Sequence, residues 1–432
     1  VLANAIRPMW SDGDEIIVMP GTYTSTASEV VDMRGKEIWL HSSAGAELTI
    51  IDGEGLHRVL LCKTSESNKT IIEGFTITKG DAWEGSNPQD GGGIRCENSS
   101  PTITNCIISY NNANYGGGIE CRYSSPKIIN CTISNNTAIN GGGGFRCDVG
   151  DSNPTLENCI FENNTATNGG GMFNLDSSSG SSLTNCIFTG NTASNSGGGI
   201  YNYNNSPTLT NCTFIGNTAD DGGGVSSNDG SPTFTECDFT SNTATNDGGG
   251  MYIEYGSPIL TNCTFENNTT VTWNGGGIWC YNSSPVITTC VFKNNVTADF
   301  GGGIYNTSDG DTKPALENTT VCGNIPDQVY GNYSDGGGNT IDESCWLDCN
   351  ENGIDDLEDI ANQTSFDCDQ NGVPDECQPD CDGDGWIDAC DNDTDIDGDG
   401  IPDNCELDCN ENSLPDDFEI AQGLAQDCNG NG

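Results

Sequence analysis

The sequence is poor in basic residues. It has 13 Lys and Arg against 64 Asp and Glu, which gives a formal net charge of −51 at pH 7. Nucleic acids and anionic membrane surfaces are bound through Lys and Arg, which neutralise phosphate groups. The composition therefore argues against both as partners and favours divalent cations instead.

Apolar residues are also scarce, at 33% of the chain, and no run of 18 apolar residues occurs. The first value argues against a large globular core, and the second against a transmembrane helix. Glycine is abundant, with 58 residues. A solenoid suits this composition, because each coil buries only a thin strip against its neighbours. The 23 cysteines favour an oxidising compartment, so we expect a secreted, extracellular or cell-surface protein.

An internal repeat runs through the middle of the chain. Glycine triplets begin at nine positions that follow one another at nearly equal steps: Gly91, Gly116, Gly141, Gly169, Gly197, Gly222, Gly248, Gly275 and Gly301. A Cys keeps step with them, and an Asn follows at a fixed distance after each Cys, as in Cys212 and Asn217. One unit reads GGGI-x5-SP-T-[IL]-T-N-C-x-F-x-x-N-T-A. Its short apolar stretches, separated by Gly, Pro, Asn and Ser, predict short strands joined by turns.

Stacked coils explain why these residues recur. If each unit is one coil, equivalent residues lie about 4.8 Å apart and each column touches copies of itself. A buried Asn column then satisfies its own amides, and Cys and Phe columns form continuous apolar strips. We therefore expect the Asn and Cys columns to be architectural. Four cysteines in a second partial column are expected either to pair or to stay as packed thiols: Cys96, Cys121, Cys147 and Cys280.

The predicted fold is an all-β, right-handed parallel β-helix of about ten or more coils, followed by a calcium-loop, disulfide-rich module. We expect residues 1–90 to form an N-terminal cap and the first coils, and residues 91–345 the regular repeats. Residues 346–432 then form the acidic module. An open solenoid end exposes core and strand edges, which is why a cap is expected.

Two segments carry a resemblance to known families. Residues 13–23, GDEIIVMPGTY, resemble the start of pectin-lyase-like β-helix proteins. The GGGI motif with Phe-x-x-Asn, as at Phe161–Asn164 and Phe188–Asn191, is similar to the repeats of the polymorphic outer-membrane protein family. The resemblance spans residues 90–305. It departs from the family's GGA[ILV] by a third glycine and places Ile at 108 and 133 instead of Phe. It implies a parallel β-helix with an adhesive role.

The last segment changes in composition. Residues 346–432 hold 27 of the 64 acids and no Lys or Arg. Loops of the form D-x-[DN]-x-[DN]-G recur there, and this pattern places oxygen ligands as in EF-hand-type calcium loops. The sequence therefore predicts calcium as a cofactor. The predicted ligands are, loop by loop, Asp348, Asn350, Asn352, Asp356 and Asp359; Asp367, Asp369, Asn371 and Asp375; Asp380, Asp382, Asp384, Asp388 and Asp391; Asp395, Asp397, Asp399, Asp403 and Glu406; and Asp408, Asn410, Asn412, Asp416 and Glu419.

The spacing of these loops resembles two families. The shorter steps between loop starts are similar to thrombospondin type 3 repeats, and the longer steps resemble dockerin modules. In the thrombospondin-like family disulfides link neighbouring loops. The resemblance implies three pairs here: Cys349–Cys368, Cys390–Cys405 and Cys409–Cys428.

No catalytic constellation emerges from the residues. A pectate lyase needs Arg or Lys beside calcium-binding carboxylates, yet no basic residue lies between Arg146 and Lys293. His41 and His57 are expected to be structural or surface groups. Asp220 and Asp221, the best acidic pair, precede a glycine corner and are interpreted as turn residues. We therefore expect a protein that is not an enzyme.

Three classes of function stay open. The first is a calcium-stiffened extracellular structural or adhesive protein, which associates with itself or with other surface proteins and assembles into a fibre. The second is a polysaccharide-binding or polysaccharide-degrading protein of the pectin-lyase-like fold. The third is binding of ice or a mineral through outward Thr columns. The first is the main prediction, because the repeated residues are explained by architecture.

Overall fold

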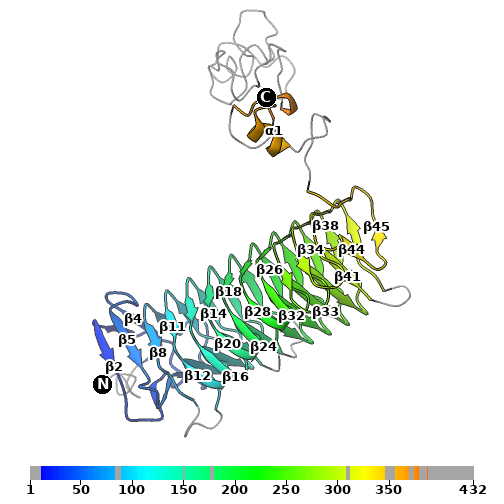
Figure 1. The fold of residues 1–432 in the computed structure, drawn as a ribbon. Helices are drawn as coiled ribbons and strands as arrows, with labels where there is room; N and C mark the ends of the chain where they lie inside the picture. Colours follow the sequence, from blue (N-terminus) through cyan, green and yellow to red (C-terminus); the bar gives the residue numbers. More distant parts are fainter. Residues whose placement is uncertain are drawn as a thin grey trace, which may run out of the picture. The chain divides into compact units, whose positions relative to one another are not determined.

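The computed structural model describes residues 11–82, 89–148, 150, 152–175, 180–307, 312–345, 356–368, 374–378 and 387. The chain divides into two compact units, residues 1–344 and 345–432. The first unit is a stack of coils whose strands all pair in parallel, and Figure 1 shows them running in sequence order from β2 to β45. This confirms the predicted parallel β-helix. In the described part of the second unit lie helix α1 (Asp356–Asn362) and a 3₁₀ turn, η2 (Asp375–Cys377).

Sheet A has 13 strands along the stack. They are β1 (Glu15–Val18), β4 (Trp39–Ser42), β7 (Ile71–Glu73), β10 (Thr102–Thr104), β14 (Lys127–Ile129), β18 (Thr155–Glu157), β22 (Ser182–Thr184), β26 (Thr208–Thr210), β30 (Thr233–Thr235), β34 (Ile259–Thr261), β38 (Val286–Thr288), β42 (Ala315–Glu317) and β45 (Ser334–Asp335).

Sheet B also has 13 strands. They are β2 (Gly21–Tyr23), β5 (Thr49–Asp52), β8 (Thr76–Thr78), β11 (Ile107–Ser109), β15 (Thr132–Ser134), β19 (Ile160–Glu162), β23 (Ile187–Thr189), β27 (Thr213–Ile215), β31 (Asp238–Thr240), β35 (Thr264–Glu266), β39 (Val291–Lys293), β43 (Thr320–Cys322) and β46 (Thr340–Asp342).

Sheet C, of 12 strands, follows the glycine corners. Its strands are β3 (Glu29–Asp32), β6 (Arg58–Cys62), β9 (Ile94–Glu97), β13 (Ile119–Arg122), β17 (Phe145–Cys147), β21 (Met172–Leu175), β25 (Ile200–Tyr203), β29 (Val225–Asn228), β33 (Met251–Glu254), β37 (Ile278–Tyr281), β41 (Ile304–Asn306) and β44 (Val329–Tyr330).

Sheet D, of 8 strands, precedes the corners. Its strands are β12 (Asn112–Tyr115), β16 (Thr137–Gly141), β20 (Thr165–Asn168), β24 (Thr192–Ser196), β28 (Thr218–Asp221), β32 (Thr243–Asp247), β36 (Thr269–Thr270) and β40 (Val296–Thr297). A regular coil thus has four strands where the sequence showed two apolar stretches.

The stretch through each Cys is split into two strands by a short turn. In one coil Asn211 and Cys212 separate β26 from β27, and Asn211 has φ of 52°. Asn adopts this left-handed conformation more readily than most residues, because its short polar side chain bonds locally. The chain therefore turns from sheet A to sheet B before Cys212, whose side chain faces the core.

The core is built from the expected self-stacking columns. The rings of Phe161, Phe188, Phe214, Phe239, Phe265 and Phe292 stack with centroids 4.3–5.0 Å apart. The Asn column is fully buried, and each amide donates to the next: Asn217 Nδ2 lies 3.0 Å from Asn242 Oδ1. The Cys columns are free buried thiols. The alternative that Cys96, Cys121, Cys147 and Cys280 remain packed thiols is therefore the one the structure shows.

The glycine corners let the coils approach closely. Gly222 has φ of +68°, and a Cβ on Gly224 would lie 2.6 Å from the carbonyl oxygen of Gly250 in the next coil. A side chain at this position would force the coils apart. The corner thus sets the tight path by which sheet D leads into sheet C.

Candidate functional site: the outer face of sheet C

Most of the predicted calcium ligands lie outside the described residues. They are Asp348, Asn350, Asn352, Asp369, Asn371, Asp380, Asp382, Asp384, Asp388, Asp391, Asp395, Asp397, Asp399, Asp403, Glu406, Asp408, Asn410, Asn412, Asp416 and Glu419. The described ones are Asp356, Asp359, Asp367 and Asp375. Within the described residues no three His, Cys, Asp or Glu side chains gather closely enough to hold a metal ion. The calcium sites stay a prediction.

Two described acids of this segment accept hydrogen bonds from their own unit. Asp359, at the end of the first predicted loop, is buried and accepts from Thr364 Oγ1 at 2.6 Å. Asp375 Oδ1 accepts from the Cys368 N–H at 2.9 Å. These hydrogen bonds tie Thr364 to α1 and Cys368 to η2.

Four cysteines of the described chain are disulfide-bonded: Cys322, Cys345, Cys368 and Cys377. Only Cys368 was among the predicted disulfide cysteines. Its predicted partner Cys349 lies outside the described residues, as do Cys390, Cys405, Cys409 and Cys428, so the pairing stays a prediction. Most cysteines of the β-helix are thiols in the core. Far fewer of the 23 cysteines are thus available for disulfides, the bonds that indicate an oxidising compartment.

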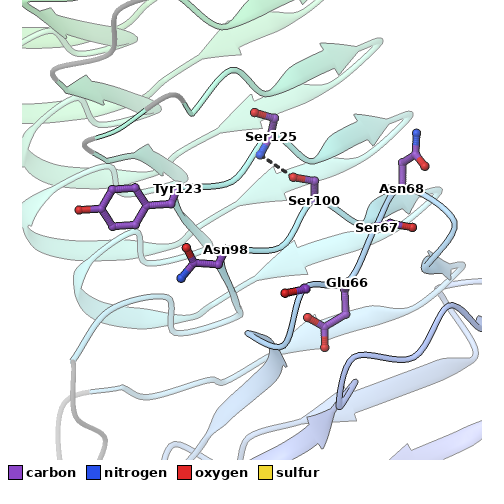
Figure 2. Close-up of a pocket in the computed structure, with 8 residues that line it drawn as sticks. Glu66, Ser67, Asn68, Asn98, Ser100, Tyr123 and Ser125 are labelled. Carbon is purple, nitrogen blue, oxygen red and sulfur yellow. Dashed lines mark hydrogen bonds between the residues drawn. The ribbon is translucent and has the colours of Figure 1, made fainter.

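A polar groove of ≈ 570 Å³ lies at the turns between sheets C and A (Figure 2). It is lined by Ser65, Glu66, Ser67, Asn68, Asn98, Ser100, Tyr123 and Ser125. Burial alone would raise the pKa of Glu66, but hydrogen bonds from Ser99, Gly35 and Thr64 outweigh it and lower the pKa. The only acid in this lining is thus a structural acceptor that ties three turns together, and the groove does not favour chemistry.

The outer face of sheet C carries a different set of side chains. Side chains along each strand of sheet C point alternately into the core and outward. The residue that follows the first core-facing residue after each glycine corner therefore points outward. Register pairing aligns these outward residues into one column: Arg95, Glu120, Arg146, Phe173, Tyr201, Ser226, Tyr252, Trp279, Tyr305 and Tyr330. The column changes character along the stack, from charged to aromatic.

The aromatic members stack on one another. Ring centroids of Phe173 and Tyr201 are 5.1 Å apart, those of Tyr252 and Trp279 4.4 Å, and those of Tyr305 and Tyr330 5.2 Å. Ser226 interrupts the series between Tyr201 and Tyr252. We call Phe173, Tyr201, Tyr252, Trp279, Tyr305 and Tyr330 the aromatic column. Apart from Phe173 its members are partly exposed, and because stacked rings cover one another's faces, the column presents ring edges and polar tips to solvent.

Carboxyl groups border the aromatic column on the side of sheet D. Asp221 ends β28 and is the register partner of Asp247, which ends β32. Burial, then the neighbouring charge of Asp247, raises the pKa of Asp221 to about 6. Burial also raises the pKa of Asp247, against hydrogen bonds from Asn274. Asp221 does precede the corner, as the sequence predicted, but it is more than a turn residue, because its carboxyl is partly buried beside a second one.

A third carboxyl lies on the opposite side of the aromatic column. Glu254 is two residues after Tyr252 on β33 and accepts from Asn228 Nδ2 at 2.7 Å. Burial raises the pKa of Glu254, while a hydrogen bond from Tyr252 acts against this rise. Burial, followed by the charges of Glu254, Asp221 and Asp247, raises the pKa of Tyr252. The Tyr252 hydroxyl therefore stays protonated and lies within the field of all three acids.

The charged end of the column is enclosed. Arg95 and Glu120 are 1% and 0% exposed, and Arg146 Nη1 lies 3.4 Å from Glu120 Oε1. The Arg146 guanidinium also lies 3.8 Å over the Tyr115 ring. Burial raises the pKa of Glu120 to about 8, although Arg146 opposes this shift. These groups are covered, so the accessible part of the face begins after them, at the aromatic column.

The two histidines lie in the first coils. His41 Nε2 is 2.8 Å from Glu15 Oε1, and its ring stacks on Trp39 at 4.1 Å. His57 offers its backbone carbonyl to the N–H of Asp81. Both contacts are structural. Among the described residues, no helix is long and apolar enough to span a membrane.

Several solved structures resemble this chain at low similarity. A GH87 α-1,3-glucanase catalytic unit from Streptomyces thermodiastaticus is 14% identical, with 79% of this chain and 65% of that chain covered and a TM-score of 0.41. A mannuronic acid-specific polysaccharide lyase from human gut microbiota is 13% identical, covering 73% and 84%, with a TM-score of 0.36. The A-module of the Azotobacter vinelandii mannuronan C-5 epimerase AlgE6 is 12% identical, covering 76% and 90%, with a TM-score of 0.34.

The prediction that the chain is not an enzyme is corrected by these comparisons, because the glucanase, the lyase and the epimerase are enzymes. No activity is thereby shown for this chain. This chain spans less than two thirds of the glucanase unit. No curated protein sequence matches at a significant level.

The family of the chain is settled by a sequence match. The model described as "Right handed beta helix region" matches residues 38–207 and 168–324, which together cover more than half of the 432 residues. It agrees with the parallel pairing of every sheet described above. The chain belongs to the right-handed β-helix family.

Proposed function

We propose that this is an extracellular polysaccharide-binding protein and that the polysaccharide lies along the outer face of sheet C. The observation that carries the proposal is the aromatic column. The stacked rings form an apolar ridge of ring edges with polar tips, and such surfaces are favoured where a ligand has both apolar and polar faces, as sugar rings do. The column extends over consecutive coils, which suits a polymer better than a single small molecule.

Hydrogen-bonding groups border the rings on both sides. Asp221 and Asp247 lie on one side, and Asn228 and Glu254 on the other. Polar groups beside an apolar platform fix the orientation of a bound ligand. The arrangement supports polysaccharide binding over the adhesive fibre of the sequence-based prediction, which remains a hypothesis.

The test is a pull-down and calorimetric screen of the full chain against a panel of purified polysaccharides, with Trp279→Ala as the variant. Trp279 stacks on Tyr252, so its loss removes one platform worth about 1 kcal/mol, roughly a fivefold loss of affinity. The matched control is Trp39→Ala on sheet A, which should bind as the wild type does. A wild-type chain that binds no polysaccharide, or equal effects of the two variants, would refute the proposal.

Cleavage of the bound polysaccharide is a second candidate, favoured by the acid pair. A carboxyl with a pKa of about 6 can both hold and release a proton near neutral pH, which general acid catalysis requires. Asp221→Asn should then abolish the release of reducing ends while binding persists. Asp238→Asn on sheet B makes the same charge change elsewhere and should leave cleavage intact. Cleavage retained in Asp221→Asn would exclude this role.

A further inference from the structure

The charge of the aromatic face narrows the kind of polysaccharide it can accept. This inference rests on the proposed function and concerns its ligand class. No Lys or Arg occurs between Arg146 and Lys293, a stretch that includes Tyr201, Tyr252 and Trp279. Lys293 itself lies on sheet B and pairs with Glu266 at 3.3 Å. A polymer of uronic acids or sulfated sugars would therefore meet only like charge on this part of the face.

The position of the acids follows from a one-coil offset between sheets D and C. The last residue of a sheet D strand lies beside the outward sheet C residue of the next coil, not of its own coil. At the start of the stack, Tyr115 of one coil lies against Arg146 of the next. A Cβ on Gly141 would likewise lie 2.4 Å from Phe173 of the next coil. Tyr115, Gly141, Asn168, Ser196, Asp221 and Asp247 form one register column of sheet D. The same offset places Asp221 beside Tyr252 and Asp247 beside Trp279.

This offset puts two carboxyl groups against the edges of two stacked rings. Tyr252 and Trp279 are the closest stacked pair of the aromatic column, at 4.4 Å with an interplanar angle of 6°. Both acids act on the Tyr252 hydroxyl, which agrees with their placement. Glu254 closes the other side of Tyr252 through its hydrogen bond. The platform is thus bordered by three acids and by no base.

The charge of Asp247 disfavours the ionised form of Asp221, its partner in the adjacent strand, because both are partly buried. The Asp247 carboxylate accepts from the Asn274 N–H at 3.1 Å. A neutral ligand that covers the platform would shield the two carboxylates further from water and so strengthen their repulsion. A ligand with an ammonium group would remove it and gain charge-assisted hydrogen bonds.

We propose that the platform of Tyr252 and Trp279 binds a polysaccharide of amino sugars with free ammonium groups, one of which lies between Asp221 and Asp247. The sugar lies along the exposed edges of the aromatic pair, and the ammonium donates to the two carboxylates. The interaction is selective for a positively charged polymer over its neutral and acidic counterparts.

The experiment compares three oligosaccharides of equal length by calorimetry with the full chain near neutral pH: a glucosamine oligomer, its N-acetylated form and an oligomannuronate. We expect the glucosamine oligomer to bind about tenfold or more tightly than the N-acetylated form, because a charged hydrogen bond is lost on acetylation. Asp221→Asn and Asp247→Asn should each remove most of this difference. Any loss of affinity for the N-acetylated oligomer should be clearly smaller than the loss for the glucosamine oligomer.

The control separates this site from the general attraction of an acidic protein for a polycation. Asp238→Asn on sheet B makes the same charge change at an exposed acid of another face and should leave the preference unchanged. Equal losses in Asp221→Asn and Asp238→Asn would overturn the inference.

Other outcomes separate the inference from the proposed function. If the N-acetylated oligomer binds as well as the glucosamine oligomer, the proposed function stands and the charge selectivity is wrong. If oligomannuronate binds only with added calcium and loses that binding in Asp221→Asn, the acids hold a divalent cation and the inference is wrong. If no oligosaccharide binds, the proposed function fails as well.

Discussion

Replacing Asn217 by alanine tests whether the Asn column holds the coils together. The Asn217 side chain makes four hydrogen bonds inside the core. Its Oδ1 accepts from the backbone N–H and from Nδ2 of Asn191, each at 3.0 Å. Its Nδ2 donates to the Phe188 carbonyl at 2.9 Å and to Asn242 Oδ1 at 3.0 Å. The side chains of Asn191, Asn217 and Asn242 are 0% exposed.

Alanine leaves all four partner groups without Asn217. Asn191 Nδ2 keeps its bond to the Phe161 carbonyl, and Asn242 Oδ1 keeps its bond from the backbone N–H of residue 217, so the loss is counted per hydrogen bond. At a net value of about 1 kcal/mol each, the four bonds sum to about 4 kcal/mol, a large part of the roughly 5–15 kcal/mol by which native proteins are stable. Because each coil contacts only its neighbours, the damage should begin in the coils that contain Asn191 and Asn242.

The assay is urea unfolding followed by fluorescence, together with hydrogen exchange of the coils on either side. The matched control is Asn211→Ala, at the turn that opens the same stretch. Asn211 is exposed, and its side chain makes one hydrogen bond, to Asn185 Oδ1 at 2.8 Å. Its φ of 52° adds a conformational cost for alanine of about 1–2 kcal/mol. If Asn217→Ala destabilises no more than Asn211→Ala, or if exchange rises uniformly along the stack, the Asn column does not act as argued.

Three further predictions concern the core, the enclosed charges and the acidic segment. Phe239→Ala should cost about 3–5 kcal/mol and Phe239→Leu clearly less, measured by urea unfolding, because Phe239 stacks between two rings at 4.3 and 4.8 Å; equal costs would contradict the stacking argument. Burial raises the pKa of Glu120 from 4.5 to about 8, so the folded chain retains a proton that the unfolded chain loses, and stability should fall as pH rises between these values. Glu120→Gln should flatten this fall in a pH series of urea midpoints, and an unchanged slope would exclude Glu120 as its source. Calcium chelation should increase hydrogen exchange after residue 345 while the β-helix stays protected, and loss of protection along the whole chain would contradict the division into two modules.

The repeat was predictable because its residues contact copies of themselves. A period in Cys212 and Asn217 implies equal environments in every coil, and equal environments in one chain mean stacking. The same logic correctly predicted the buried Asn column and the packed Cys column that includes Cys212, and it left open whether the second Cys column pairs. It did not predict four strands per coil. The left-handed turn at Asn211 divides a stretch that reads as a single apolar run, and the sheet D strand Thr218–Asp221 has only one apolar residue, Ala219.

The outer face of sheet C was missed for the opposite reason. Its column varies from coil to coil, so a search for invariant positions within the repeat passes over it. A signal was nonetheless present: an aromatic residue lies two positions after the last glycine of five corners, at Phe173, Tyr201, Tyr252, Trp279 and Tyr305. Alternation of side chains along a strand places such a residue on the outside once the preceding residue is known to face the core.

The pairing of Asp221 with Asp247 could not be read from the spacing. Thr218 pairs with Thr243, and the same offset would bring Asp221 opposite Asn246. Asp221 instead pairs with Asp247, because the register shifts between Ala219 and Asp221. Such an irregularity inserts one residue into one strand and leaves the inward columns in step. The period of the sequence does not show where in the coil the extra residue falls.

The division between inward and outward columns also bears on where this β-helix can hold its function. An inward residue is fixed by its copies above and below, so a change at Asn217 or Phe239 disturbs three coils at once. An outward residue on sheet C carries no such constraint, and Ser226 can stand between Tyr201 and Tyr252 without loss of register. Specificity is therefore expected where the repeat is least regular, which on this chain is the stretch from Ser226 to Trp279 beside the two aspartates. If substitutions in the outward column of sheet C changed folding stability as much as those in the Asn column, this separation of scaffold from binding face would not hold.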